Sequence, residues 1–317
     1  MRIVFCGTSE FAVPSLRRLA KEPGFTIEAV VTQPDRPRGR GRELGASPVK
    51  DAALEAGVHV YQPERIKSVS AAEFFRRTAP DAIIVIAYGQ IIPAFLLGEP
   101  RFGWINLHAS LLPKYRGAAP INWAVVNGEL TTGMTTMRIE AGLDTGPILQ
   151  QIEMQIGPDE TAPELAARLA EAGAPLMLET LKKLERGEIT PMPQDERQAT
   201  HAPLLEKEHG RIDWTQTARA IYNRIRGLAP WPGAYTTFRG RLCHIWGSPA
   251  ADAAAAATEI PGTIIAAPRQ LYVVCGEGTC LRLEAAQVEG RKRVSARDFA
   301  NGMRLAGNER FGAELTK

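Results

Sequence analysis

The stretch Ala82-Ile83-Ile84-Val85-Ile86-Ala87-Tyr88 is a continuous run of apolar and aromatic residues without a charged side chain. A strand covered by helices on both faces has such a run, whereas a strand with one solvated face alternates apolar and polar residues. Similar runs lie upstream at 2–8 and 27–32, and helical patterns follow them at 13–21 and 48–56. Strands that alternate with helices favour a doubly wound sheet. We therefore predict an α/β protein with a Rossmann-like, mostly parallel N-terminal sheet.

The turn after the first strand does not carry a nucleotide-binding fingerprint. Its sequence, Gly7-Thr8-Ser9-Glu10-Phe11, lacks the G-x-G-x-x-G spacing that lets a pyrophosphate approach a helix N-terminus. The chain has no Walker A motif either. The predicted fold therefore implies neither NAD nor ATP binding.

Downstream, the apolar run 103–107 predicts another buried strand, but this one carries Asn106 and is followed by His108. Residues two apart in a strand share a face, so the carboxamide and the imidazole are expected side by side at the carboxyl end of the strand, where ligands bind in open α/β sheets. An amide and a protonated imidazole both suit an oxyanion at a carbonyl carbon, and a neutral imidazole can instead accept a proton. A histidine that only bonds to backbone at the strand end explains this spacing equally well.

A third polar group favours the chemical interpretation. Asp144 lies in the glycine-flanked loop Gly142-Leu-Asp144-Thr-Gly146, after a strand predicted at 135–139. Such a loop can approach His108, orient its ring and stabilise its cation.

Four motifs together resemble one enzyme family: Asn106-x-His108, Ser110-Leu-Leu-Pro113, Tyr115-Arg-Gly-Ala-Ala-Pro120 and Gly142-Leu-Asp144-Thr-Gly146. They are similar to the 10-formyltetrahydrofolate-dependent formyltransferases, above all to the members that act on initiator methionyl-tRNA, and the resemblance covers essentially the whole chain. It implies transfer of the formyl group of 10-formyltetrahydrofolate to the free amino group of methionine on the tRNA, for translation initiation. Asn106 and His108 would then donate hydrogen bonds to the oxyanion, while Asp144 holds His108 as a cation and helps to take the amine proton.

The same resemblance implies where the folate co-substrate binds. Backbone amides and apolar side chains at the end of the 82–88 strand and in the turn after His108 would line the pterin pocket. The residues assigned to folate are Tyr88, Gly89, Gln90, Ile91, Ile92, Ser110, Leu111, Leu112, Pro113 and Ile139.

An arginine-rich segment, Gln33-Pro-Asp-Arg-Pro-Arg-Gly-Arg-Gly-Arg-Glu43, follows the second strand. It cannot bury apolar surface, so we expect an exposed, mobile loop, and a plain solvated charge run is one interpretation of it. The resemblance implies instead that the loop contacts the acceptor stem of the initiator tRNA. The arginines assigned to tRNA are Arg36, Arg38, Arg40 and Arg42, with Arg40 and Arg42 as the principal contacts.

A length of 317 residues is sufficient for two domains. We predict a catalytic domain at 1–187, a linker rich in proline, glutamine and charge at 188–208, and a smaller OB-like β-barrel at 209–317 that binds tRNA. The net charge is only +3, but from residue 201 onward there are 16 Lys and Arg against 11 Asp and Glu. A basic C-terminal third favours a polyanionic partner. At the linker, Leu204 and His201 depart from the lysine and tyrosine that the family pattern suggests.

The four cysteines have neither C-x-x-C spacing nor a histidine cluster, so we predict buried free thiols, no metal site and a reducing compartment. With no signal peptide or transmembrane run, we expect a cytoplasmic protein, and we predict a monomer.

Two rival functions remain at this point. One is a formyltransferase for a small amine, such as a nucleotide-linked amino sugar, or a hydrolase of formyltetrahydrofolate that uses the same Asn-His-Asp site. The other is a non-catalytic RNA-binding protein. The arginine loop argues against the first, and the intact polar trio argues against the second.

Overall fold

The computed structural model describes residues 1–38, 43–98, 100–250, 259–267, 270–306 and 309–312. Its contacts divide the chain into two compact units, which are described separately. The first unit comprises residues 1–120, 131–155 and 164–203, and the second comprises 121–130, 156–163 and 204–317. The predicted boundaries at 187 and 209 stay a prediction.

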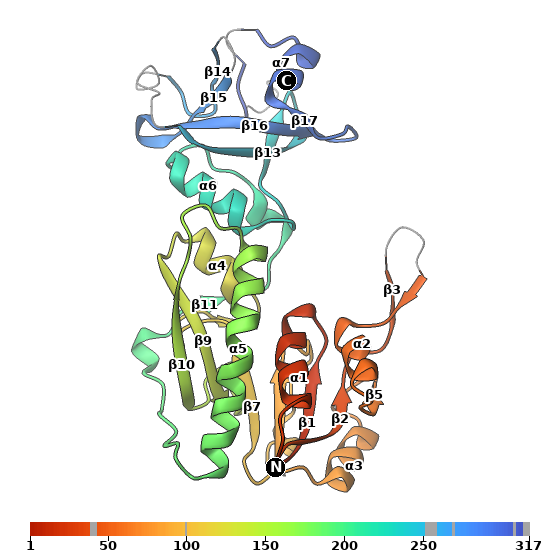
Figure 1. Cartoon of the computed structure of the whole chain (residues 1–317). Coiled ribbons are helices and arrows are strands. Elements are labelled where there is room, and N and C mark those ends of the chain that lie inside the picture. Colours follow the sequence, from red (N-terminus) through yellow and green to blue (C-terminus); the bar gives the residue numbers. More distant parts are fainter. Residues whose placement is uncertain (39–42, 99, 251–258, 268–269, 307–308, 313–317) are drawn as a thin grey trace. The chain divides into compact units, whose positions relative to one another are not determined.

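The first unit is built on one seven-stranded sheet in the order β10-β9-β7-β6-β1-β2-β5 (Figure 1). The five strands from β7 to β5 run parallel, while β9 is antiparallel to both β7 and β10. All five residues of β6 are buried, as the apolar run predicts. The strand bounds are β1 Arg2–Gly7, β2 Thr26–Val31, β5 Val60–Tyr61, β6 Ala82–Ile86, β7 Trp104–His108, β9 Thr131–Arg138 and β10 Ile148–Gln155.

Helices cover both faces of this sheet, so the doubly wound, mostly parallel prediction is confirmed. On one face, α5 packs so closely on β7 that a Cβ on Gly173 would lie 2.7 Å from the side chain of Leu107. The residues adjacent to Leu107, Asn106 and His108, point to the other face because side chains alternate along a strand. The helix bounds are α1 Val13–Ala20, α2 Pro48–Glu55, α3 Val69–Thr78 and α5 Ala162–Glu185.

The arginine-rich loop differs from the expectation at its base. Strands β3 (Arg36–Arg38) and β4 (Glu43–Gly45) pair as an antiparallel ladder. The base is also tied to the unit, since Asp35 accepts a hydrogen bond from Gln62 at 2.8 Å and pairs with Lys50 at 2.5 Å. The polar composition could not indicate this ladder, because backbone hydrogen bonds need no particular side chain.

The second unit contains an antiparallel sheet in the order β12-β13-β16-β15-β14, with β17 paired to β16. Its core joins α6, α7 and the sheet around three aromatic rings, Phe238, Phe299 and Phe311. This confirms a small β domain, although no ladder among the described strands joins β12 to β14. The bounds are α4 Pro120–Val126, α6 Ala218–Gly227, β12 Tyr235–Phe238, β13 Arg241–Ala250, β14 Ile264–Ala267, β15 Gln270–Val274, β16 Cys280–Val288, β17 Val294–Ser295 and α7 Ala296–Met303.

All four cysteines are free and buried, as predicted. Within the described ranges, no helix is both long and apolar enough to cross a lipid bilayer.

Candidate active site

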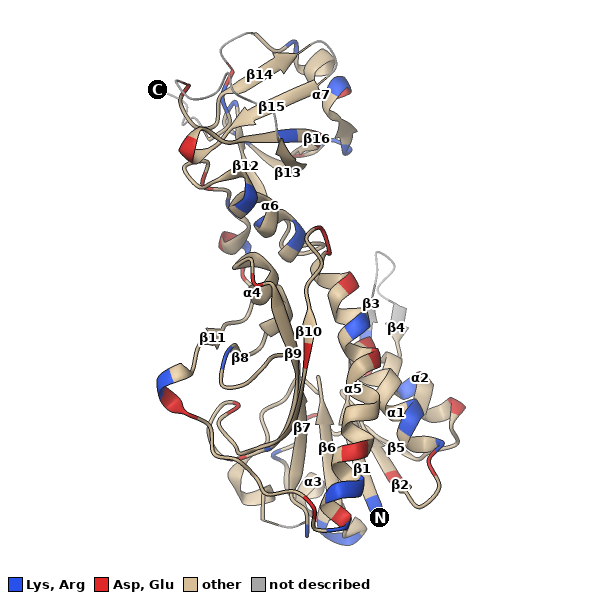
Figure 2. Ribbon diagram, turned by 60° about the vertical axis from the view of Figure 1, so that its left-hand side comes forward, with Lys and Arg blue, Asp and Glu red and all other residues tan. Residues whose placement is uncertain are grey.

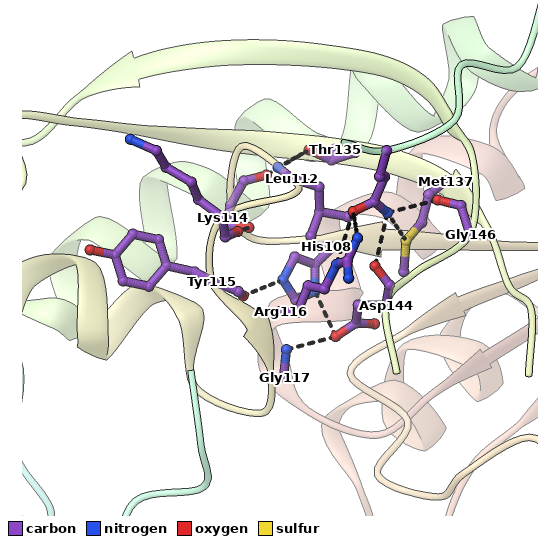
Figure 3. Close-up of polar contacts among 12 residues, drawn as sticks. His108, Leu112, Lys114, Tyr115, Arg116, Gly117, Thr135, Met137, Asp144 and Gly146 are labelled. Atoms are coloured by element: carbon purple, nitrogen blue, oxygen red, sulfur yellow. Dashed lines mark hydrogen bonds and ion pairs between the residues drawn. The ribbon is translucent and has the colours of Figure 1, made fainter. Parts of the chain in front are cut away.

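His108 lies at the end of β7 with only 6% of its side chain exposed, and both of its ring nitrogens face protein oxygens (Figure 3). Nε2 is 2.9 Å from the backbone oxygen of Tyr115. Nδ1 is 3.6 Å from Oδ2 of Asp144, beyond the usual hydrogen-bond range of about 2.7–3.2 Å. A backbone carbonyl can only accept a hydrogen bond, so the contact with Tyr115 suits a proton on Nε2, and Nδ1 faces the carboxylate.

Asp144 reaches His108 from the loop after β9, as the sequence predicts. Its backbone has a left-handed φ of 52°, and its Oδ2 accepts a hydrogen bond of 2.8 Å from the amide of Gly117. Gly146 lets this loop lie close to β9, because a Cβ there would be only 1.9 Å from the carbonyl oxygen of Arg138. Only glycine therefore fits at position 146 without a clash. The loop then presents the carboxylate of Asp144 to the imidazole.

Asn106 is half-buried on the same face of β7 as His108. Its backbone is held between β6 and β9, opposite Val85 and Met137. In the part of the chain that the structure describes, its carboxamide makes no hydrogen bond. An amide beside the His108–Asp144 pair is thus free to donate to a ligand.

The turn after His108 is fixed by its own polar groups. Ser110 donates from Oγ to the carbonyl of Lys114 at 2.6 Å. Thr135 of β9 donates to the carbonyl of Ser110 at 2.6 Å and accepts from the amide of Leu112 at 3.2 Å. Leu112 is buried against Met137, and Pro113 follows it through a cis peptide bond. The side chains of Ser110 and Leu112, two of the residues assigned to folate, thus help to build the turn.

The other residues assigned to folate differ in accessibility. The side chains of Tyr88 and Ile92 belong to the core, and the hydroxyl of Tyr88 is buried with no hydrogen-bond partner among the described residues. Gln90 accepts a hydrogen bond from the amide of Ile66 at 2.8 Å, whereas Ile91 is 89% exposed. Leu111, Gly89 and the half-buried Ile139 complete the set.

The arginines assigned to tRNA are described only in part. Arg36 is exposed, and the backbone of Arg38 belongs to β3. Arg40 and Arg42 lie outside the described residues. Of the two linker departures, Leu204 is 70% exposed and His201 is exposed as well.

A group of residues without a predicted role adjoins this site. Strands β8 (Arg116–Gly117) and β11 (His201–Ala202) pair in parallel. Arg116 is buried, with 3% of its side chain exposed, and it bonds to Gln194 and Glu196. The hydrogen bond to Glu196 raises the pKa of Arg116, although burial opposes the shift. Arg116 belongs to one of the family motifs in the sequence, but nothing in the sequence indicates a role for Gln194.

A cavity of about 480 Å³ lies in the second unit, lined by Arg211, Trp214, Tyr235 and Phe311 among others. None of the predicted site residues lines it, so the candidate active site rests on the polar geometry around His108.

Comparisons with known proteins identify the family of this chain. Residues 1–181 match the family model described as formyl transferase, and residues 204–304 match its C-terminal domain. The methionyl-tRNA formyltransferase of Solibacter usitatus is 56% identical over 98% of this chain and 99% of its own. That of Acidobacterium capsulatum is 52% identical over 99% of this chain and 100% of its own.

Solved structures share the fold at much lower identity. WlaRD, a sugar 3N-formyl transferase, has a TM-score of 0.66 and 18% identity over 92% of this chain and 99% of its own. An N-formyltransferase from Helicobacter canadensis also has a TM-score of 0.66, with 16% identity over 89% of this chain and 98% of its own. The chain thus belongs to the formyl transferase family, in the group of the methionyl-tRNA formyltransferases.

Proposed function

We propose that this enzyme transfers the formyl group of 10-formyltetrahydrofolate to the amino group of initiator methionyl-tRNA, giving N-formylmethionyl-tRNA. The observation that carries the proposal is the free carboxamide of Asn106 beside the His108–Asp144 pair. It occurs in a chain that matches enzymes named methionyl-tRNA formyltransferase over nearly their full length.

The polar groups suit attack of an amine on a formyl carbon. The folate co-substrate supplies the formyl carbonyl, and negative charge develops on its oxygen as the amine attacks. The tetrahedral intermediate then collapses, the bond between the formyl carbon and N10 of the folate breaks, and N10 takes a proton as tetrahydrofolate leaves. Asn106 can donate an N–H to that oxygen without giving up a hydrogen bond to any residue that the structure describes. For His108 we assign the donor to Nδ1, because Nε2 already faces the carbonyl of Tyr115 at 2.9 Å.

Asp144 has two roles in this scheme. Its negative charge stabilises the protonated ring of His108, from which it is separated by 3.6 Å. The hydrogen bond from Gly117 fixes one carboxylate oxygen, so the second remains for the proton that leaves the amine, directly or through a water molecule.

Folate binding is assigned to the residues around β6 and the turn after β7. Gly89, Gln90 and Ile91 would offer backbone groups to the pterin edge, supported from the core by Tyr88 and Ile92. The pterin slot would be completed by the 110–113 turn and Ile139. A slot of backbone amides and apolar side chains fits a flat heterocycle.

Binding of tRNA is assigned to the arginines of the β3–β4 loop together with the second unit. On α6, where Figure 2 shows basic segments, Arg219 is exposed, whereas Arg226 is buried and donates hydrogen bonds to the backbone oxygens of Gly157 and Glu160. Each phosphate contact releases counterions, so KM for the charged tRNA should rise with salt. We expect Arg40→Ala and Arg42→Ala to raise this KM and to reduce its salt dependence, with little effect on kcat. If KM does not respond to salt, the arginine loop does not contact phosphates.

We further propose a monomer that works in the cytoplasm, the compartment that suits four unpaired thiols. Light scattering at micromolar concentration tests the oligomeric state, and a dimer mass refutes it.

The central test mixes the purified enzyme with 10-formyltetrahydrofolate and methionyl initiator tRNA, and measures N-formylmethionine. A parallel reaction contains free methionine in place of the charged tRNA. Formylation only of the charged tRNA is the expected result. If 10-formyltetrahydrofolate loses its formyl group and no tRNA is formylated, the acceptor is water or a small amine. Binding of tRNA with no turnover would leave only an RNA-binding protein.

A further inference from the structure

The segment 194–202, which the sequence places in a linker, contacts the residues on both sides of His108 and Asp144. The backbone oxygen of Thr200 accepts a hydrogen bond of 2.8 Å from the backbone amide of Arg116. The side-chain hydroxyl of Thr200 accepts one of 2.9 Å from the backbone amide of Tyr115. Tyr115 is the residue whose carbonyl faces His108. The segment therefore belongs physically to the candidate active site.

Gln194 has the densest set of contacts in this segment. Its Nε2 donates to the backbone oxygen of Asp144 at 2.8 Å and to that of Gly146 at 2.7 Å. Its Oε1 accepts two hydrogen bonds from Arg116, from Nε at 3.0 Å and from Nη2 at 2.8 Å. One half-buried amide thus links the loop that carries the carboxylate to the strand after His108.

The chemistry of the neighbours fixes the orientation of this amide. A guanidinium has only donors and a backbone carbonyl has only lone pairs, so the oxygen of Gln194 must face Arg116 and its nitrogen must face the loop. Arg116 is itself held by Glu196, with bonds of 2.8 Å to each carboxylate oxygen. If the amide were flipped, its N–H groups would face the N–H groups of Arg116, and its oxygen would face the carbonyl oxygens of the loop.

The loop needs such a restraint because Asp144 has a left-handed backbone conformation, with φ at 52°. This conformation is unfavourable for residues other than glycine, although aspartate tolerates it better than most. The two bonds from Gln194 hold the carbonyls of residues 144 and 146, on either side of the turn.

We propose that Gln194 is a positioning residue, which holds the 144–146 loop so that the carboxylate of Asp144 faces His108. This role rests on the proposed function, because it assigns Gln194 to the same formyl transfer. In this role Gln194 acts through Asp144 and not on the substrate itself. Its effect is on the placement of Asp144, and misplacement of a reacting group by about 1 Å can cost a factor of about 10² in rate.

Two variants separate this role from simple support of the fold. Gln194→Ala removes the four hydrogen bonds described above, together with a weak one of 4.0 Å from Nε2 to Sδ of Met137. Gln194→Glu keeps an oxygen for Arg116 but replaces both N–H groups with an oxygen that repels the carbonyls of Asp144 and Gly146. The matched control is Gln198→Ala, since Gln198 lies on the same segment, is exposed, and bonds only to Asp195 within the described residues.

We expect both Gln194 variants to lower kcat, corrected for the folded fraction, by about 10²-fold, with KM for both substrates changed less than about threefold. Amide hydrogen exchange at Asp144, Thr145 and Gly146 should accelerate, and the control should behave as wild type. A Gln194→Glu enzyme with wild-type kcat would overturn the proposal, because the contact with Arg116 would then suffice. Unchanged exchange in Gln194→Ala, or an equal loss in the control, would overturn it as well.

The exchange measurement needs no substrate, so it is independent of the reaction. A wild-type enzyme that fails to formylate charged tRNA would refute the proposed function. Exchange that stays slow in Gln194→Ala would refute the positioning role, whatever the reaction proves to be.

Discussion

Truncation of Asn106 to alanine should separate catalysis from stability. The side chain is half-buried on β7, and within the described structure its carboxamide bonds to nothing, so Asn106→Ala breaks no internal hydrogen bond and strands no partner. Substitutions of this kind usually change the free energy of unfolding by less than about 0.5 kcal/mol. Loss of one oxyanion donor, by contrast, costs about 10²–10³ in kcat, or about 2.7–4 kcal/mol of transition-state stabilisation.

The assay measures kcat for formylation of methionyl initiator tRNA together with urea unfolding of the same preparation. Asn106→Asp should be worse than alanine in kcat, because a carboxylate would repel the developing oxyanion. Asn122→Ala is the matched control, since Asn122 donates a hydrogen bond of 2.7 Å to the carbonyl of Gly227. It should lose about 1 kcal/mol of stability and keep its kcat. A folded Asn106→Ala enzyme with kcat within threefold of wild type would refute the assignment.

Three further predictions concern the surroundings of the site. Gly146→Ala should displace the Asp144 loop, because the new Cβ would lie 1.9 Å from the carbonyl oxygen of Arg138, so we expect lower kcat and a lower melting temperature. The hydrogen bond from Arg116 lowers the pKa of Glu196 from its ordinary 4.5, so the stabilisation is present above about pH 4.5 and is lost as the pH falls through the lowered value. Glu196→Gln should lessen the fall in melting temperature over that acidic range, and an unchanged curve would contradict this. Burial raises the pKa of Cys243 to about 11, and all four thiols should therefore react slowly with a thiol reagent at pH 8 until urea unfolds the chain.

The sequence was sufficient to predict the structural features that particular side chains determine. The apolar run 82–88 predicted a strand covered on both faces, and the structure buries every residue of β6. The spacing of Asn106 and His108 predicted that they share a face, and the glycines around Asp144 predicted that its loop approaches the imidazole, which the distance of 3.6 Å confirms. In each case a steric or apolar property of particular residues determines the placement.

The sequence could not predict contacts made by the backbone. The acceptor for Nε2 of His108 is the carbonyl of Tyr115, and any residue at that position carries a carbonyl. The β3–β4 ladder has the same character, because its arms pair through backbone groups within a polar, arginine-rich segment. For this reason the sequence could not indicate which ring nitrogen of His108 faces the carbonyl of Tyr115 and which faces Asp144.

The same limit explains why the sequence did not indicate that part of the predicted linker, 188–208, pairs with the strand after His108. The segment is polar and rich in proline, as linkers are, yet β11 pairs with β8, and Ala202 lies so close that a Cβ on Gly117 would be 2.6 Å from its carbonyl oxygen. Gly117, with φ at 123°, is therefore required by the approach of the segment, and its amide then donates to Asp144. The Tyr115-Arg-Gly117 motif contributes a carbonyl to His108, a buried cation to Gln194 and an amide to Asp144. These contacts hold His108 and Asp144 in place, so under the proposed mechanism substitutions in this motif should lower kcat through geometry.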